Sequence, residues 1–481
     1  MLDLHLLLGV DTANPGLRLV GEAIERGNFC CVRKLGVETA RSVGKEEEEE
    51  EENIEEGKSV LFSSLSHTKL PMLSEFVWQG SDDWTAYNAW QASPLTNADI
   101  TRFAEAVRVG NISGLRVLEL VGDSKSDDEW FGSEGMEALM GSVVESEEGL
   151  PFLEKIRLSC TRAGEGGVSL GGTLMSGKLP KLSVIDLSNS RLTDEGLRGL
   201  GHAVREGGLV GVASLNLNSN KGIEKESWEG FMRNIAQSER GMPKLRFLDL
   251  SETSADSVGG PLSVALASGK LPSLETLGVY FLGLDETGVG DLGEALRAGG
   301  WPPGFAKAGE NSKVDFTLDQ TDVNLDELIR AIGESEIGLP SFVYCLNLSR
   351  GRLSEEALAS LAANGGRASG GKLSQLKHLD LSSCGLDDAR LRRLGEVLSA
   401  HECRELEKID LDNNRISIKG LSAFLEALSP QSLPKLRDLS LKSQNRVEGE
   451  ELGVREQREF ASAVASLQAA AQRNGKLLKW R

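Results

Sequence analysis

The sequence has few aromatic residues, histidines and cysteines, and each shortage excludes a class of protein or site. Aromatic residues make up only 5% of the 481 positions, so aliphatic side chains must fill the core, which suits thin stacked layers better than one large globule. The five histidines are scattered, and the six cysteines form no C-x-x-C pair, so no metal site is expected. No histidine accompanies a serine or cysteine in a nucleophile motif. We therefore expect no enzyme, no catalytic residue and no cofactor.

Positive charge is also scarce. The 53 Lys and Arg residues face 73 Asp and Glu residues, for a formal net charge of −20, which argues against nucleic acid or an anionic membrane as a partner. The scattered cysteines indicate a reducing compartment. The first residues, MLDLHLLLGVD, contain Asp3 and His5 and have no basic segment, so they predict neither a signal peptide nor a membrane span. We expect a cytoplasmic protein, with a nuclear location as the alternative.

One short segment occurs twice, as SGKLPKL at residues 176–182 and SGKLPSL at residues 268–274. Gly172, Gly177 and Lys178 have the spacing of a phosphate-binding loop, but Leu179 stands where that motif needs Ser or Thr for Mg²⁺. The second copy lacks the upstream glycine. Because proline cannot extend a helix, both copies are better interpreted as a helix end followed by the start of a strand.

A second pattern, L-x-x-L-x-L, recurs along the chain. Successive copies start 29 to 33 residues apart in most cases and 37 to 42 residues apart in the others. A helical pattern follows each strand, as at residues 193–204, 354–365 and 417–428, and Thr193 and Ser354 are natural N-caps. The unit at Asn311 is the weakest, so a break in the strand ladder is most expected there. The fourteen units begin at Met1, Val32, Leu73, Leu115, Leu153, Leu182, Val212, Leu245, Leu274, Asn311, Val343, Leu376, Leu406 and Leu436.

These units resemble the leucine-rich repeats of the ribonuclease-inhibitor type, which also form the repeat domains of NOD-like receptors and of the Ran GTPase-activating protein. The resemblance covers essentially the whole chain. It implies an α/β solenoid, or horseshoe, with parallel strands on the concave face and helices on the convex face. It also implies that Asn220, Cys384 and Asn414 bind the backbone of the turn after the strand. We expect one domain over residues 1–481, with an acidic low-complexity insertion at 44–58.

The central outward position of each predicted strand supplies candidate partner-binding residues for the concave face. Six carboxylates and one cation in this column favour a protein partner with a basic surface. The alternative is that aspartate is ordinary at this position and merely solvated. The charged members of the column are Glu119, Arg157, Asp186, Asp249, Asp315, Asp380 and Asp410.

Three insertions, at residues 44–58, 80–90 and 122–135, leave from strand ends and are expected along one rim. Trp84, Tyr87, Trp90 and Trp130 lie there among polar and acidic residues, as aromatic anchors of binding sites do. Alternatively, these rings pin the loops onto the solenoid. The glutamate run itself is typical of a disordered loop, or else it is a docking segment.

The sequence thus favours a protein-interaction scaffold that binds through the concave face and this rim. Two alternatives stay open. One is a GTPase activator like that of Ran, although that group generally carries its acidic run after the repeats. The other is the sensor fragment of a larger receptor.

Overall fold

The structure is a computed structural model, and the chain divides into two compact units, Met1–Asp249 (unit 1) and Leu250–Arg481 (unit 2), each described by itself. The described residues are 2–8, 13–39, 41–42, 47–80, 90–91, 94–122, 130–253, 259–278, 286–297, 315–317, 323–335, 338–339, 343, 345–363, 372–401, 403–428, 433–447, 450–451 and 479–480.

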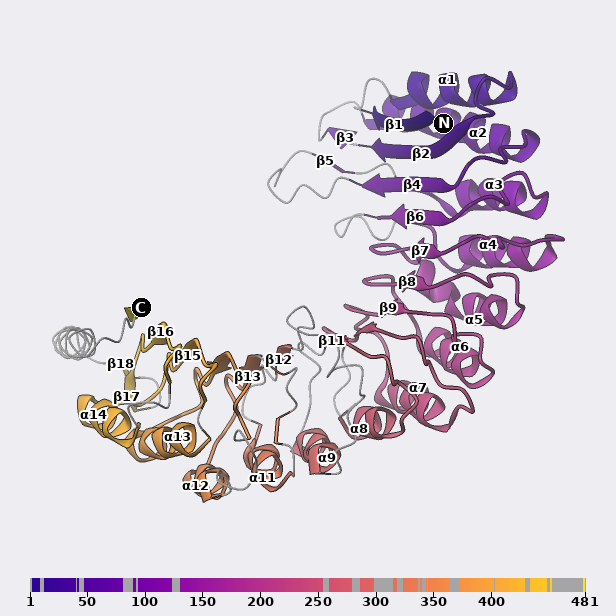
Figure 1. Cartoon of the computed structure of the whole chain (residues 1–481). Helices are drawn as coiled ribbons and strands as arrows, with labels where there is room; N and C mark the ends of the chain where they lie inside the picture. Colours follow the sequence, from indigo (N-terminus) through magenta and orange to yellow (C-terminus); the bar gives the residue numbers. More distant parts are fainter. Residues whose placement is uncertain are drawn as a thin grey trace. The chain divides into compact units, whose positions relative to one another are not determined.

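In unit 1, parallel strands form one layer and helices a second, and the strands neighbour each other in chain order (Figure 1). The strands are β1 (Leu2–Leu8), β2 (Val32–Thr39), β4 (Glu75–Gly80), β6 (Val117–Val121), β7 (Lys155–Arg157), β8 (Val184–Asp186), β9 (Ser214–Asn216) and β10 (Phe247–Asp249). The helices are α1 (Ala13–Glu25), α2 (Glu47–His67), α3 (Asn97–Arg108), α4 (Ser133–Glu145), α5 (Gly167–Met175), α6 (Asp194–Arg205) and α7 (Lys225–Gln237).

Unit 2 repeats this alternation, and its six-stranded parallel sheet has the order β12-β13-β14-β15-β16-β19. Its strands are β11 (Thr276–Gly278), β12 (Asp315–Thr317), β13 (Cys345–Asn347), β14 (His378–Asp380), β15 (Lys408–Asp410), β16 (Asp438–Ser440) and β19 (Lys479–Trp480). Its helices are α8 (Gly259–Ala267), α9 (Glu286–Arg297), α11 (Asp326–Glu334), α12 (Glu355–Ala363), α13 (Asp388–Ala400) and α14 (Ile418–Ala427). A hairpin pairs β17 (Asn445–Val447) with β18 (Glu450–Glu451).

The predicted strand register is confirmed in most of the repeats. Arg157 lies opposite Asp186 and Asp380 opposite Asp410, both in the central column. Asp315 is the exception, because it lies opposite Cys345 rather than Asn347, two residues from the predicted position. The weak unit lacks the leucines that fix the register elsewhere. As expected, the ladder breaks there, since β11 is not part of the sheet that β12 begins. Strand β19, next to β16, was not predicted.

In three repeats, a buried side chain eight residues after the start of the repeat ties its turn to the preceding repeat. The Asn220 amide donates to the carbonyls of Leu187 and Leu217, at 2.8 and 2.9 Å. Asn414 repeats this arrangement, and the Cys384 thiol donates to the Leu348 carbonyl at 3.1 Å. The expected role of these three residues is therefore confirmed. The predicted N-caps are also present, since Thr193 and Ser354 accept the N–H groups of Gly196 and Ala357.

In two repeats, the lysine of the Gly-Lys-Leu segment caps the end of the helix of the preceding repeat. Lys178 Nζ donates to the carbonyls of Ser146 and Glu147, at 2.9 and 2.8 Å, just beyond α4. Lys372 Nζ likewise donates to the Ser335 carbonyl beyond α11. A positive ammonium satisfies carbonyls that a helix end leaves unpaired and complements its dipole. Lys178 thus has a structural role, and a phosphate-binding role is not needed to explain it.

Residues 47–58 of the acidic insertion belong to helix α2, so the expectation of a disordered loop is wrong for them. Glutamate is a good helix former, and acidic residues are favoured near a helix N-terminus. The same helix contains a buried cation. Lys58 is 0% exposed, donates to the Pro94 carbonyl at 2.8 Å and pairs with Asp99 at 3.1 Å. The insertion is thus tied to helix α3.

His401 is fully buried in unit 2, where its ring joins two other segments. Nδ1 accepts the N–H of Lys372 at 2.9 Å, and Nε2 lies 2.9 Å from the Leu361 carbonyl, to which it donates. This arrangement requires the neutral ring, since a second ring proton would break the bond from Lys372. Burial lowers the pKa of His401, and the Lys372 charge adds to this effect, while the Leu361 bond opposes it.

Acidification is therefore expected to destabilise unit 2. As the pH falls below about 6.5, the unfolded chain takes up a proton on His401 that the folded chain excludes, so the free energy of unfolding decreases. Denaturant titrations between about pH 7.5 and 5.5 measure this slope. His401→Gln is expected to flatten it, whereas His202→Gln, at an exposed position on α6, is not. Equal slopes for the wild type and His401→Gln would contradict the prediction.

Candidate interaction surface

The outward side chains of the strands form a charged surface, and in unit 1 four of its carboxylates are paired with cations of neighbouring strands. Such cross-strand pairs lie close together and neutralise one another. The pairs are Asp3–Arg33 at 2.5 Å, Glu75–Arg33 and Glu75–Lys34 at 3.3 Å, Glu119–Lys155 at 2.6 Å, and Asp186–Arg157 at 3.2 Å. The strand face of unit 1 therefore has little uncompensated charge around these residues.

In unit 2, three carboxylates lie together on the strand face. Asp380 and Asp410 are opposite one another on β14 and β15, and Asp412 follows β15. We call these three residues the acidic strand patch. Among the described residues, the ion pair that involves this patch joins Asp410 to Lys408, and its N–O distance is long, at 3.9 Å. Burial raises the pKa of Asp410, and the charges of Asp412 and Asp380 add to this effect, while the N–H of Asp412 and the Lys408 charge oppose it.

The central column also has a structural role that explains part of its composition. In each case, a side-chain oxygen accepts the backbone N–H two residues further on. These bonds join Asp186 to Ser188, Asn216 to Asn218, Asn347 to Ser349, Asp380 to Ser382, and Asp410 to Asp412, at 2.9 to 3.1 Å. A neutral amide makes this bond as well as a carboxylate does. At these five positions the turn uses a side-chain acceptor, and the bond does not depend on the charge of Asp380 or Asp410.

The predicted aromatic rim is only partly described. Trp130 is 2% exposed, so the prediction that it is an exposed anchor is wrong. A Cβ on Gly122 would lie 3.1 Å from its ring, which shows that the ring lies against the backbone of its own repeat. This is the alternative in which a ring pins its loop. Trp84 and Tyr87 lie outside the described residues.

The end of the second insertion forms a short antiparallel pair with the segment just before the first insertion. Strand β3 (Arg41–Ser42) follows β2, strand β5 (Trp90–Gln91) precedes α3, and Ser42 lies opposite Trp90 (Figure 1). The backbone of Trp90 is therefore placed beside Ser42, two residues before the first insertion, while its side chain lies outside the described part of the structure. Of the remaining candidates, Asp249 is half-buried on β10, and Asp315 has a described backbone only.

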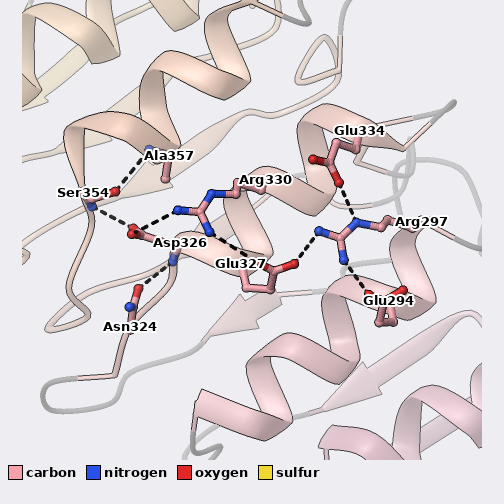
Figure 2. Close-up of polar contacts among 9 residues, drawn as sticks. All are labelled: Glu294, Arg297, Asn324, Asp326, Glu327, Arg330, Glu334, Ser354 and Ala357. Carbon is pink, nitrogen blue, oxygen red and sulfur yellow. Dashed lines mark hydrogen bonds and ion pairs between the residues drawn. The ribbon is translucent and has the colours of Figure 1, made fainter.

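The helix layer of unit 2 also has many charges, but they pair with one another. Arg297 on α9 contacts three carboxylates, Glu294 at 2.7 Å, Glu327 at 2.5 Å and Glu334 at 2.8 Å (Figure 2). Two of these come from α11, so the network joins neighbouring helices. Figure 2 also shows Arg330 between Asp326 and Glu327. These acids belong to helix stacking, which distinguishes them from the acidic strand patch.

Within the described ranges, no group of three His, Cys, Asp or Glu side chains could hold a metal ion. None of the helices in the described part of the chain is long and apolar enough to cross a membrane.

A family model described as Leucine Rich repeat matches residues 178–201 and 373–389. No curated protein matches the chain. Several solved structures are similar at 14% identity. A leucine-rich-repeat protein of Leptospira interrogans has a TM-score of 0.40, with coverage of 96% of this chain and 98% of that one. A chain of the yeast Rad7–Elc1 complex has a TM-score of 0.29, with coverage of 75% and 83%. LegL7 of Legionella pneumophila has a TM-score of 0.32, with coverage of 69% and 94%. Two segments of the chain thus match leucine-rich repeats, and its alternating parallel strands and helices form the leucine-rich-repeat α/β solenoid.

Proposed function

We propose that this chain is a non-catalytic, cytoplasmic interaction scaffold with repeats of the ribonuclease-inhibitor type, and that it binds a basic segment of a partner protein. The acidic strand patch on β14 and β15 is the proposed contact. One observation carries the proposal: these carboxylates accumulate on the strand face, whereas the strand-face acids of unit 1 named above are paired with cations. Lysine and arginine side chains of a partner would supply the missing positive charge.

The test is the triple variant Asp380→Asn, Asp410→Asn and Asp412→Asn in the full chain. It removes three charges and keeps every acceptor, since Asn216 and Asn347 already make the same backbone bond in this protein. Asp412 Oδ1 accepts from Ser440 Oγ and Lys442 N, which an asparagine oxygen can also do. Binding of a lysine- and arginine-rich peptide is expected to weaken about tenfold or more at low ionic strength.

A matched control has the same change in net charge elsewhere. Glu195→Gln, Glu356→Gln and Glu426→Gln lie on α6, α12 and α14 and are expected to leave peptide binding nearly unchanged. The difference between the two triple variants should shrink as salt is added. Equal weakening by both would mean that net charge, and not this patch, attracts the peptide, and the proposed site would be wrong. If only the Asn variant weakens binding, proteins that the wild type captures from a lysate and the Asn variant does not are candidate partners.

A further inference from the structure

Two adjacent cysteines lie exposed in the turn between α1 and β2. Neither Cys30 nor Cys31 is in a disulfide, and their Sγ atoms are 3.6 Å apart. The turn is fixed on both sides of the pair, because Asn28 N–H donates to the Ala23 carbonyl and Val32 N–H to the Phe29 carbonyl, both at 3.0 Å. The two thiols are therefore held close together at the surface, at the point where the chain enters β2.

The buried cysteines of unit 2 have a different environment. Burial raises the pKa of both Cys384 and Cys403 to about 12, so these thiols are protonated and shielded from reagents in solution. Cys384 in addition donates to the Leu348 carbonyl. The exposed pair has no such protection, and it is the place in the described chain where two thiols touch.

The contact between the sulfurs also affects the proton of Cys30. The pKa of Cys30 is raised, first because Cys31 hydrogen-bonds it and then because a charge on Cys31 would repel a second one. The 3.6 Å separation places each sulfur within reach of a group bound to the other. One sulfur attacks an oxidant and its neighbour resolves the product, the arrangement that thiol–disulfide exchange requires.

We propose that Cys30 and Cys31 form a dithiol–disulfide redox site that low-molecular-weight disulfides oxidise. In the first step, one cysteine thiolate attacks the disulfide R–S–S–R, forms a mixed disulfide with one half and releases the other half as a thiolate. The neighbouring thiol then loses its proton and attacks the protein sulfur of the mixed disulfide, which releases the second R–S⁻. The protein loses two electrons and two protons, and the reagent is reduced to two thiols.

The resulting bond is expected to be easily reversed. The Cα atoms of adjacent residues are about 3.8 Å apart across a trans peptide, which is shorter than the 4.4–6.8 Å of ordinary disulfides. Strained and exposed disulfides are the easily reduced ones, so this pair suits a switch rather than a structural link. Ring closure would act on the start of β2, where Arg33 pairs with Asp3 and Glu75 on the strand face.

The experiment treats the reduced full chain with oxidised glutathione and maps the products by mass spectrometry after tryptic digestion. Trypsin cleaves after Arg26 and after Arg33, which releases the peptide 27–33 with both cysteines. From the wild type, we expect this peptide to be lighter than its dithiol form by two hydrogen atoms and to retain no glutathione. Cys30→Ser and Cys31→Ser should each retain one glutathione, because the resolving thiol is gone. Dithiothreitol should restore the starting mass, and the rate should rise with pH.

A synthetic peptide of residues 27–33 is the matched control for the turn. The folded chain is expected to close the disulfide at least about tenfold faster than this peptide, because the turn already holds the sulfurs in contact. Wild-type protein that keeps glutathione on either cysteine, or that closes the bond no faster than the peptide, would overturn the proposal. The first result would mean that no disulfide forms within the pair, and the second that the fold contributes nothing to the reaction.

Discussion

Lys58→Met is expected to destabilise unit 1 by about 3–5 kcal/mol, because it leaves one partner of a buried ion pair without the other. Lys58 and Asp99 are both 0% exposed, and Glu55 also contacts the ammonium. Asp99 accepts the N–H and hydroxyl of Thr96 as part of the capping box of α3. Methionine preserves the length of the side chain, so the loss measures the missing charge and the unpaired Pro94 carbonyl. Denaturant unfolding followed by circular dichroism measures the effect.

Two further variants separate this charge from its surroundings. Arg102 also pairs with Asp99, at 3.3 Å, but it is 42% exposed, so Arg102→Met should cost less than about 1 kcal/mol. In the double variant Lys58→Met and Asp99→Asn, the buried negative charge is removed as well. Since an asparagine at position 99 can still accept the N–H of Thr96 in the capping box, much of the lost stability should return. A Lys58→Met protein as stable as the wild type would show that the pair contributes nothing.

The sequence was sufficient to predict the repeat and nearly all of its register. Leucines at fixed spacing bury one side of each strand. Because successive side chains of a strand point to opposite faces, the residues between the leucines must point outward. Asp315 was misplaced because its unit starts with Asn311 and has Val314 and Phe316 in place of the usual leucines. A shift of two residues leaves the same side chains facing inward, so the pattern of burial could not distinguish the two registers.

In the acidic insertion, composition and periodicity predict different structures. The glutamate-rich composition predicts a disordered loop, whereas the spacing of the residues that follow predicts a helix, and the helix is what forms. Lys58, Leu61, Phe62 and Leu65 have the spacing i, i+3, i+4 and i+7, which places them on one face of a helix, and all four are buried. That spacing was visible in the sequence. A lysine on an apolar face is normally exposed, however, and its buried partner Asp99 is 41 residues away, so only the folded structure brings the pair together.

The candidate surface could be predicted only in part, because charge on a sheet depends on neighbouring strands. The central column suggested six carboxylates with one cation, but Lys155 and Lys34 lie in the flanking column and pair with Glu119 and Glu75. Conversely, Asp412 lies outside that column and adds to the acidic strand patch. The proposed binding surface is therefore a part of the strand face of unit 2 and not the whole strand face.

Asn220→Ala is expected to destabilise unit 1 by about 3–5 kcal/mol, because it leaves several buried backbone groups unpaired at once. The side-chain oxygen accepts the N–H groups of Ser190 and Leu192, at 3.2 and 2.9 Å. The side-chain nitrogen donates to Leu187 and Leu217. Alanine replaces none of these bonds, and the site is too enclosed for free access of water, since Asn220 is almost completely buried. The loss should appear in chemical unfolding of the full chain.

Ser190→Ala provides the matched control at the equivalent position of the preceding repeat. Ser190 Oγ is also buried, but its bond goes to the Leu187 carbonyl, which Asn220 contacts as well. Removing the serine hydroxyl therefore leaves that carbonyl paired, and the expected cost is about 1 kcal/mol or less. If both variants cost the same, the asparagine would count as one polar group among others. A larger loss for Asn220→Ala, by at least about 2 kcal/mol, would instead identify the link between neighbouring turns as a main source of stability in this solenoid.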